Sequence, residues 1–205
     1  SLEPLALHGY HADTDADERL LARGVAEEIR TFLPERLKIA EDWRLVYSLY
    51  QDGSSLATLY KLCEEYRGRR VGFVLVVRDG KDGTFGAYLT EAPHPAPSYY
   101  GTGECFLWRA TPAPTDPATN KLAKQPQAQS IRFQNFAYTG ANDYCIFCES
   151  KFLSVGGGGG GTYGLWLNDG LSRGHSATCD TFFNRPLSDE GEKFDVLGVE
   201  LWVVG

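Results

Sequence analysis

The stretch "SVGGGGGGTYGLWLNDGLSRGHSATCDTFFNRPL", Ser154 to Leu187, contains six consecutive glycines. A phosphate-binding loop requires a Lys and a Ser or Thr at the start of a helix. Here Thr162, Tyr163 and an alternating, strand-like segment follow the glycines, with no lysine at the required spacing. We therefore expect a structural loop whose backbone takes positive φ or passes close to another strand. Its residues are Gly156, Gly157, Gly158, Gly159, Gly160 and Gly161.

The composition indicates one globular domain. The chain has 205 residues, of which 42% are hydrophobic and 13% aromatic, enough for a sizeable core. Its net charge of -7 opposes binding to the phosphates of nucleic acid. No apolar run approaches the roughly 18 residues that would span a bilayer, and the N-terminus lacks the pattern of a signal peptide. We expect no direct membrane insertion, no cofactor and a monomer.

The chain contains no methionine, even at position 1, which indicates a segment of a longer protein. Its five cysteines are odd in number and irregularly spaced. This pattern is typical of reduced thiols, and it does not indicate a disulfide framework.

Helical periodicity is confined to the first third of the chain. One helix is predicted to begin after Asp17, as its N-cap, and to end before Pro34. A second is predicted within residues 53–66, with Ser54 or Ser55 as its N-cap.

Alternating and aromatic-rich segments predict strands through the rest of the chain. Residues 71–90 predict a hairpin around an Asp-Gly turn. Helices that precede many short strands predict an α+β fold, a two-sheet antiparallel β-sandwich with flanking helices. The other predicted strands are "WRLVYSLY", "GECFLWRA", "SIRFQNFAY", "DYCIFCES", "TYGLWLN" and "DVLGVELWVV".

No domain boundary is evident. Residues 1–16 are polar and predict a flexible N-terminal segment, and residues 17–205 predict a single domain. Residues 110–129 are rich in Pro, Ala, Thr and Gln, and predict a long mobile loop between two strands.

Two arrangements of cysteine and histidine are candidate sites. Cys145, Cys148, His175 and Cys179 could form a zinc site, but "DYCIFCES" has the pattern of a strand and lacks the tight turn of a zinc knuckle. Cys179, His175 and Asp180 could form a nucleophile, base and orienting acid, although such groups are rarely so close in sequence. The alternative is that "SATCDTFFN" forms a turn and a strand whose Ser, Thr and Asn side chains bond the backbone.

Two carboxylates stand in apolar surroundings. Glu104 lies between glycines and aromatic residues, and Glu200 interrupts an apolar strand. An acid in such a strand is either at an edge or held by a partner, so we favour a structural role over a catalytic one.

Several segments, considered together and in their order along the chain, resemble the TLDc domain of the oxidation-resistance proteins. The resemblance runs from the first predicted helix to the C-terminus, and the long segment 110–129 favours a fungal member. Its most specific parts are "YYGTGE", the glycines followed by "GLWL", and "TFFN". The other parts are "WRLVYS", "GSSLATLY", "FGAYLTEAPH" and "VELWVV".

The resemblance implies a β-sandwich without established catalytic residues. It also implies protection against oxidative stress and binding to subunits of the peripheral sector of the vacuolar-type proton-pumping ATPase, whose separation from the membrane sector some members promote. The resemblance thus implies a cytoplasmic protein that reaches the vacuolar membrane through this partner. It also implies a mitochondrial pool.

Our first hypothesis is therefore a non-enzymatic interaction module. Its contact residues are expected on exposed loops, and the candidates are Glu104, Asp169, Arg173 and His175. The second hypothesis is a thiol-based peroxide scavenger or redox sensor that uses Cys179 or Cys148, with Arg173 or His175 stabilising the thiolate.

Overall fold

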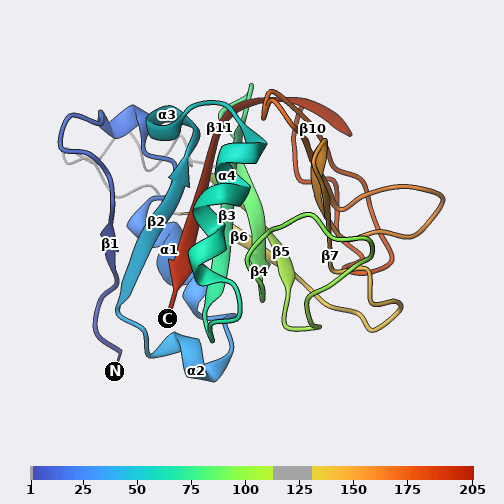
Figure 1. The fold of residues 1–205 in the computed structure, drawn as a ribbon, viewed down its shortest axis with the longest axis horizontal. Coiled ribbons are helices and arrows are strands. Elements are labelled where there is room, and N and C mark those ends of the chain that lie inside the picture. The colour runs from blue at the N-terminus through green and yellow to red at the C-terminus, as the bar shows by residue number, and fades with distance from the viewer. Residues whose placement is uncertain (1, 113–130) are drawn as a thin grey trace, which may run out of the picture.

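A computed structural model describes residues 2–112 and 131–205 of the chain. Within these ranges eleven strands form one hydrogen-bonded ladder (Figure 1). The strands are β1 (Ala6–His8), β2 (Asp42–Ser48), β3 (Gly72–Asp79), β4 (Thr84–Leu89), β5 (Phe106–Pro112), β6 (Ile131–Ala137), β7 (Ile146–Glu149), β8 (Phe152–Val155), β9 (Leu165–Asn168), β10 (Arg173–His175) and β11 (Lys193–Val204).

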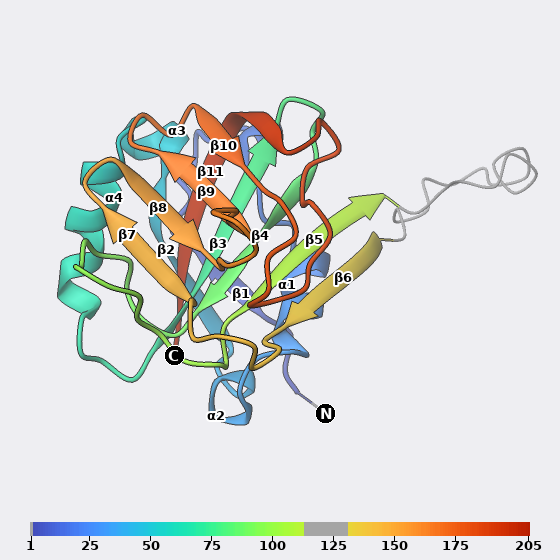
Figure 2. The ribbon, with the colours of Figure 1, turned by 90° about the vertical axis from the view of Figure 1, so that its right-hand side faces the viewer.

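The long strand β11 joins two layers of strands. One edge of β11 pairs with β10 over Arg173–His175 and then with β2, while its other edge pairs with β3. The first layer consists of β1 to β6, and the second consists of β7 to β10, which cross in front of the first in Figure 2. The predicted α+β fold with a mainly antiparallel sheet is confirmed. Hydrogen bonds through β11 nevertheless connect the two layers, and β1 pairs with β2 in parallel.

Strand β3 is apolar from Gly72 to Val77, where both of its faces are buried. Phe73, Leu75 and Val77 contribute to the core that includes residues of the second layer. Val74 and Val76 alternate with them and contribute to a second core on the opposite face. The side chains of successive strand residues point to opposite faces, so the continuous run "FVLVV" supplies both cores.

The four α-helices of the described residues pack around the first layer. Residues of α1 and α2 join the core on its outer face, while α4 joins the core between the layers. Ser55 is the N-cap of α4, as predicted, and its hydroxyl accepts a hydrogen bond from Thr58 N at 3.2 Å. The helices are α1 (Arg23–Arg30), α2 (Glu35–Lys38), α3 (Leu49–Asp52) and α4 (Leu56–Cys63).

The predicted start of the first helix is wrong. A short 3₁₀ turn spans Ala16–Glu18, and α1 begins only at Arg23. Between them, the amides of Leu20 and Leu21 donate to the carboxylate of Glu200 at 3.0 and 3.2 Å. These bonds from a strand far along the chain replace the helix that the local periodicity favours.

The buried carboxylate of Glu200 also accepts hydrogen bonds from two aromatic side chains. Tyr10 Oη lies 2.7 Å from each carboxylate oxygen, and Trp202 Nε1 lies 3.1 Å from Oε1. Burial raises the pKa of Glu200 despite these donors. The expectation that this acid has a structural partner agrees with the geometry.

The expected flexible segment 1–16 requires correction within residues 2–16. Strand β1 pairs with β2, and the Leu5 side chain is buried in the outer core. Together with the Tyr10 bond to Glu200, these contacts hold the segment on the sheet.

The predicted loop 110–129 also starts too early. Ala110 to Pro112 belong to β5 and pair with β6, since Ala110 faces Phe133 across the ladder. The remainder of the predicted loop, residues 113–129, lies outside the described residues. In the described part of the chain, no helix combines the length and the apolar character needed to cross a membrane.

Candidate interaction surface

The glycine loop, Gly156–Gly161, follows β8 and is shaped by close approaches to other segments. At Gly156 φ is +83°, and an added Cβ would lie 2.8 Å from Cys179 Sγ and 2.9 Å from a Phe182 ring carbon. At Gly160 φ is +91°, but an added Cβ would meet nothing within 4 Å. The first glycine is therefore required by packing as well as by conformation, and the later one by conformation alone.

Two polar side chains, those of Thr181 and Asn142, fix the start of the glycine loop. Gly157 N donates to Thr181 Oγ1 at 3.0 Å, and Asn142 Nδ2 donates to Gly157 O at 3.2 Å. The Thr181 hydroxyl in turn donates to Asn142 Oδ1 at 2.7 Å. These bonds tie the glycine loop to the segment that carries "TFFN", as the alternative of Thr and Asn side chains bonding the backbone predicts.

The TFFN turn, Cys179–Asn184, is held by its own hydrogen bonds. Phe183 N donates to Cys179 O at 2.8 Å and closes one turn of chain. The buried Asn184 accepts from Cys179 N at 3.2 Å and donates to Ala177 O at 3.0 Å. Phe183, whose amide closes this turn of chain, takes a left-handed conformation with φ +46°.

The two phenylalanines of the turn face opposite environments. The Phe182 side chain is buried in the core between the layers. The Phe183 side chain is 77% exposed, the most exposed large apolar side chain of the described residues.

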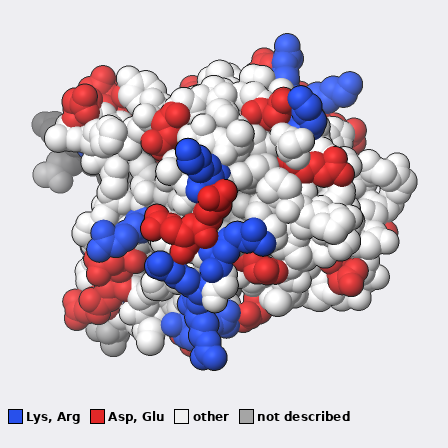
Figure 3. Space-filling view, in the orientation of Figure 1, with Lys and Arg blue, Asp and Glu red and all other residues white. Residues whose placement is uncertain are grey.

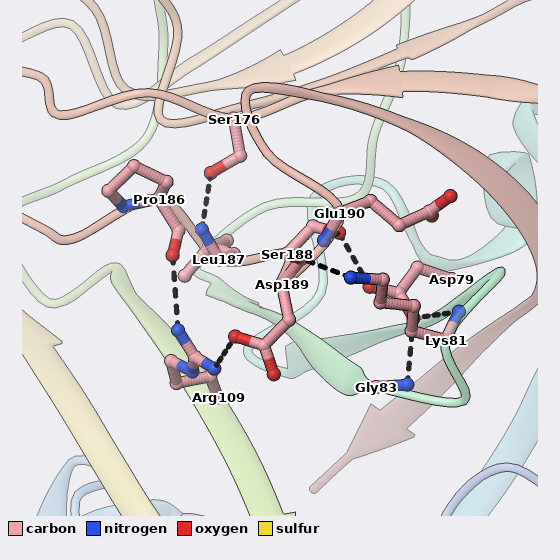
Figure 4. A network of polar contacts seen from close by, with 10 residues as sticks. All are labelled: Asp79, Lys81, Gly83, Arg109, Ser176, Pro186, Leu187, Ser188, Asp189 and Glu190. Carbon is pink, nitrogen blue, oxygen red and sulfur yellow. Dashed lines mark hydrogen bonds and ion pairs between the residues drawn. The ribbon is translucent and has the colours of Figure 1, made fainter.

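The chain beyond the turn is fixed to three other segments (Figure 4). Ser176 Oγ accepts from Leu187 N at 2.9 Å, and Arg109 donates to Pro186 O at 3.2 Å and to Asp189 at 2.8 Å. Ser188 Oγ donates to the buried Asp79 carboxylate at 2.5 Å. The TFFN turn is thus anchored on both sides.

Two of the four predicted contact residues line one groove. Arg173 and His175 on β10 line a cavity of about 360 Å³ with Trp166, Lys193 and other residues. The Arg173 guanidinium lies 3.1 Å from the Asp195 carboxylate, and both side chains are exposed.

The other two predicted residues lie elsewhere. Glu104 lines a different groove and pairs with Arg36 through two hydrogen bonds of 3.0 and 3.1 Å. Asp169 pairs with Lys151 at 3.5 Å, and its carbonyl accepts from Leu56 N at the start of α4. The four residues do not share a groove, so a common contact surface would have to extend over several loops.

The two thiols proposed as redox groups are buried. Cys179 is 1% exposed, and burial raises the pKa of its thiol. Burial likewise raises the pKa of Cys148, which is fully buried. Cys179 Sγ donates to Asn184 Oδ1 at 3.2 Å, and no hydrogen bond to His175 is present among the described residues. A reactive thiolate needs partial exposure and a nearby cation, and this geometry provides neither.

The three cysteines of the proposed zinc site all belong to the core between the layers, whereas His175 lines a surface groove. Cys145 Sγ donates to Thr102 O at 3.4 Å, and Cys148 lies in the core between the layers. Within residues 2–112 and 131–205, no three His, Cys, Asp or Glu side chains are grouped to hold a metal ion.

Charged side chains are mixed on the face that Figure 3 shows. Among its described residues, Lys and Arg alternate with Asp and Glu around α4, and the side of β7 carries fewer charges. A continuous basic surface, as nucleic acid would require, is not formed on this face.

A family model described as the TLDc domain matches residues 14–205. The chain belongs to the TLDc family. Over the whole chain, this TLDc protein is 53% identical to the Oxidation resistance protein 1 of Gibberella zeae, 54% identical to that of Podospora anserina and 42% identical to that of Saccharomyces cerevisiae. The alignments cover 71%, 65% and 79% of these relatives, so the TLDc chain spans about two thirds or more of their length.

Sequence reasoning missed the exposed Phe183 in this TLDc domain. It identified "TFFN" as specific, but two adjacent phenylalanines give no indication of which one is buried. Which phenylalanine is buried depends on how the TFFN turn packs against the glycine loop. The Phe182 ring packs so closely on Gly156 that an added Cβ there would lie 2.9 Å from it.

Proposed function

We propose that this TLDc domain is the non-enzymatic interaction module of an oxidation-resistance protein, and that it contributes to resistance against oxidative stress. The similarity over the whole chain to fungal proteins named Oxidation resistance protein 1 carries the proposal. The burial of the Cys179 and Cys148 thiols supports binding over peroxide chemistry.

The proposed partner is the vacuolar-type proton-pumping ATPase, through subunits of its peripheral sector. A protein that binds the separated sector more tightly than the assembled pump shifts the equilibrium towards separation. A shift from 1:99 to 99:1 needs about 5.5 kcal/mol of differential binding, which an interface of roughly 1,600 Å² can supply. The proposed location is the cytoplasm and, through this partner, the vacuolar membrane, with a mitochondrial pool.

A pull-down with the purified intact pump and with its peripheral sector tests this proposal, with ATP hydrolysis measured in the same samples. We expect binding to the peripheral sector and loss of coupled ATPase activity as the sectors separate. A protein that binds neither form would overturn the assignment of the pump as partner.

The contact residues are tested separately by replacing Glu104, Asp169, Arg173 and His175 with alanine in one variant. Glu104, Asp169 and Arg173 form exposed ion pairs and His175 is half-buried in a groove, so the variant should remain folded. Unchanged pump binding would show that the contact surface lies elsewhere.

The thiol hypothesis has its own test. Thiols are titrated with and without peroxide, and turnover is followed with a thiol reductant. Catalytic turnover that is lost on Cys179→Ser or Cys148→Ser would favour the enzyme, whereas slow stoichiometric oxidation would eliminate it.

A further inference from the structure

Three residues other than glycine have positive φ among the described residues: Asp82, Leu171 and Phe183. Asp82 lies in the β3–β4 turn, where Asp readily adopts this conformation. Leu171 is 1% exposed, so burial of its side chain in the core offsets the strain. Phe183 has neither justification, because a bulky residue is disfavoured at its φ of +46° and its side chain lies in solvent.

The fold imposes the left-handed backbone at position 183 but does not require phenylalanine there. A single hydrogen bond runs from Phe183 N to Cys179 O, with a left-handed residue as donor. The αL motif that ends helices has this same bond, and Gly or Asn usually occupies the donor position there. Asn184 and Thr181 lock the turn from both sides, so the backbone cannot relax around the bulky side chain. Gly or Asn at position 183 would satisfy the fold better.

Resting on the proposal that this domain acts by binding, we propose that Phe183 is the apolar anchor of its partner interface. The occupant is a protein surface with an apolar pocket and one carboxylate placed to meet Arg185. Arg185, two residues on, is exposed and has no ion pair among the described residues, so it can reach such a carboxylate. Aromatic and arginine side chains are enriched at the centres of interfaces.

The local charges favour a protein over a lipid surface. Asp180, at the surface of the same turn, would be repelled by an anionic bilayer, as would the net charge of -7. One aromatic side chain fills a protein pocket, whereas stable membrane attachment needs a larger apolar surface or a second signal.

The test compares two substitutions of exposed apolar residues by asparagine. Phe183→Asn removes the proposed anchor and relieves the strained backbone. Ile39→Asn is the matched control, because Ile39 is 70% exposed but has an ordinary φ of -80°. Phe183→Trp keeps an aromatic anchor together with the strain. Each substitution is made in the native gene of the source organism and in the purified protein.

We expect Phe183→Asn to raise the Tm by about 2–4 °C while weakening partner binding about thirtyfold. Resistance to peroxide and copurification of the peripheral ATPase sector should fall with it. Ile39→Asn should change neither, and Phe183→Trp should retain binding without the gain in Tm. A more stable variant that has lost function excludes unfolding as the cause.

Three results would overturn the proposal that Phe183 anchors a protein partner. One is a Phe183→Asn strain that is as resistant to peroxide as the wild type. The second is binding of the wild type, but not of Phe183→Asn, to phosphatidylcholine–phosphatidylserine vesicles, which would assign the side chain to a membrane. The third is self-association in sedimentation that depends on Phe183, which would make the partner a second copy.

The same experiment separates the anchor from the proposed partner. If the wild type does not copurify the peripheral sector, yet Phe183→Asn alone loses peroxide resistance, the pump is the wrong partner and the anchor stands. If the wild type and Phe183→Asn copurify the sector equally, the pump stands and the anchor is wrong.

Discussion

The N-terminal segment, residues 2–22, contains only the short strand β1 and one 3₁₀ turn, and the glycine loop contains no regular element. Different chemistry fixes each of them to the core. The N-terminal segment depends on the ionisable carboxylate of Glu200, which accepts bonds from Tyr10, Leu20, Leu21 and Trp202. The glycine loop depends on neutral hydrogen bonds and on close backbone packing. The attachment of the N-terminal segment is concentrated in one side chain and can respond to pH. The attachment of the glycine loop is distributed over several hydrogen bonds and close contacts.

The largest effect is expected at the concentrated attachment. Glu200→Gln keeps the shape but replaces one acceptor oxygen with an amide that donates, so buried donors lose their partner. We expect the free energy of unfolding to fall by about 3–5 kcal/mol, measured by urea denaturation. Tyr10→Phe, which removes one donor and keeps the ring against Trp202, should cost only about 1 kcal/mol. Equal losses in the two variants would contradict a concentrated attachment.

A smaller effect is expected at the first glycine of the loop. Gly156→Ala places a Cβ within 2.8 Å of Cys179 Sγ at a left-handed φ, and should cost about 2–4 kcal/mol. Gly160→Ala, where the space is open, should cost about 1–2 kcal/mol from conformation alone. Thermal denaturation of both variants measures the difference, and an equal cost would show that packing is irrelevant at Gly156.

The distributed hydrogen bonds should each contribute less. Thr181→Val removes the hydroxyl that joins Gly157 and Asn142, and should cost about 1–2 kcal/mol. Thr178→Val, at an exposed position of the same segment, serves as the control and should stay within about 0.5 kcal/mol of the wild type. A loss above that of Gly156→Ala would show that this hydroxyl, too, is a concentrated attachment.

The last prediction uses pH to separate the two regions. Burial raises the pKa of Glu200 above its ordinary value of 4.5, so between the two values the folded protein binds more protons than the unfolded chain. Stability from this group is therefore complete below pH 4.5 and decreases as pH rises through the raised pKa. The stability difference between wild type and Glu200→Gln should shrink as pH rises, measured by urea denaturation across this range. The difference between wild type and Thr181→Val should stay constant, and a parallel change in both would refute the distinction.

The sequence predicted those elements whose stability is local. The helix after Ser55 has both its cap and its apolar face within a few residues, and it formed where expected. The hairpin around the Asp-Gly turn, β3 and β4, also formed because its register is set by neighbours in the chain.

The failures occurred where distant groups decide the backbone. The amides of Leu20 and Leu21 bond Glu200, about 180 positions away, so no local pattern could predict an extended segment there. Strand β10 has only three residues and exists because β9 and β11 flank it. At the candidate site, motif order supplied the family, whereas the exposure of Phe183 required the packed structure.

Strand β11 has a consequence for the order in which the protein is made. It follows every other described strand in the chain, yet it pairs with β2, β3 and β10. During synthesis, all of these strands leave the ribosome before the one that unites them. The second layer cannot complete its pairing until Asp195 has emerged, and the first layer cannot until Val204 has emerged. The nascent chain must therefore keep several strand edges unpaired for most of its translation, a state in which chaperones or slow elongation would limit misassociation.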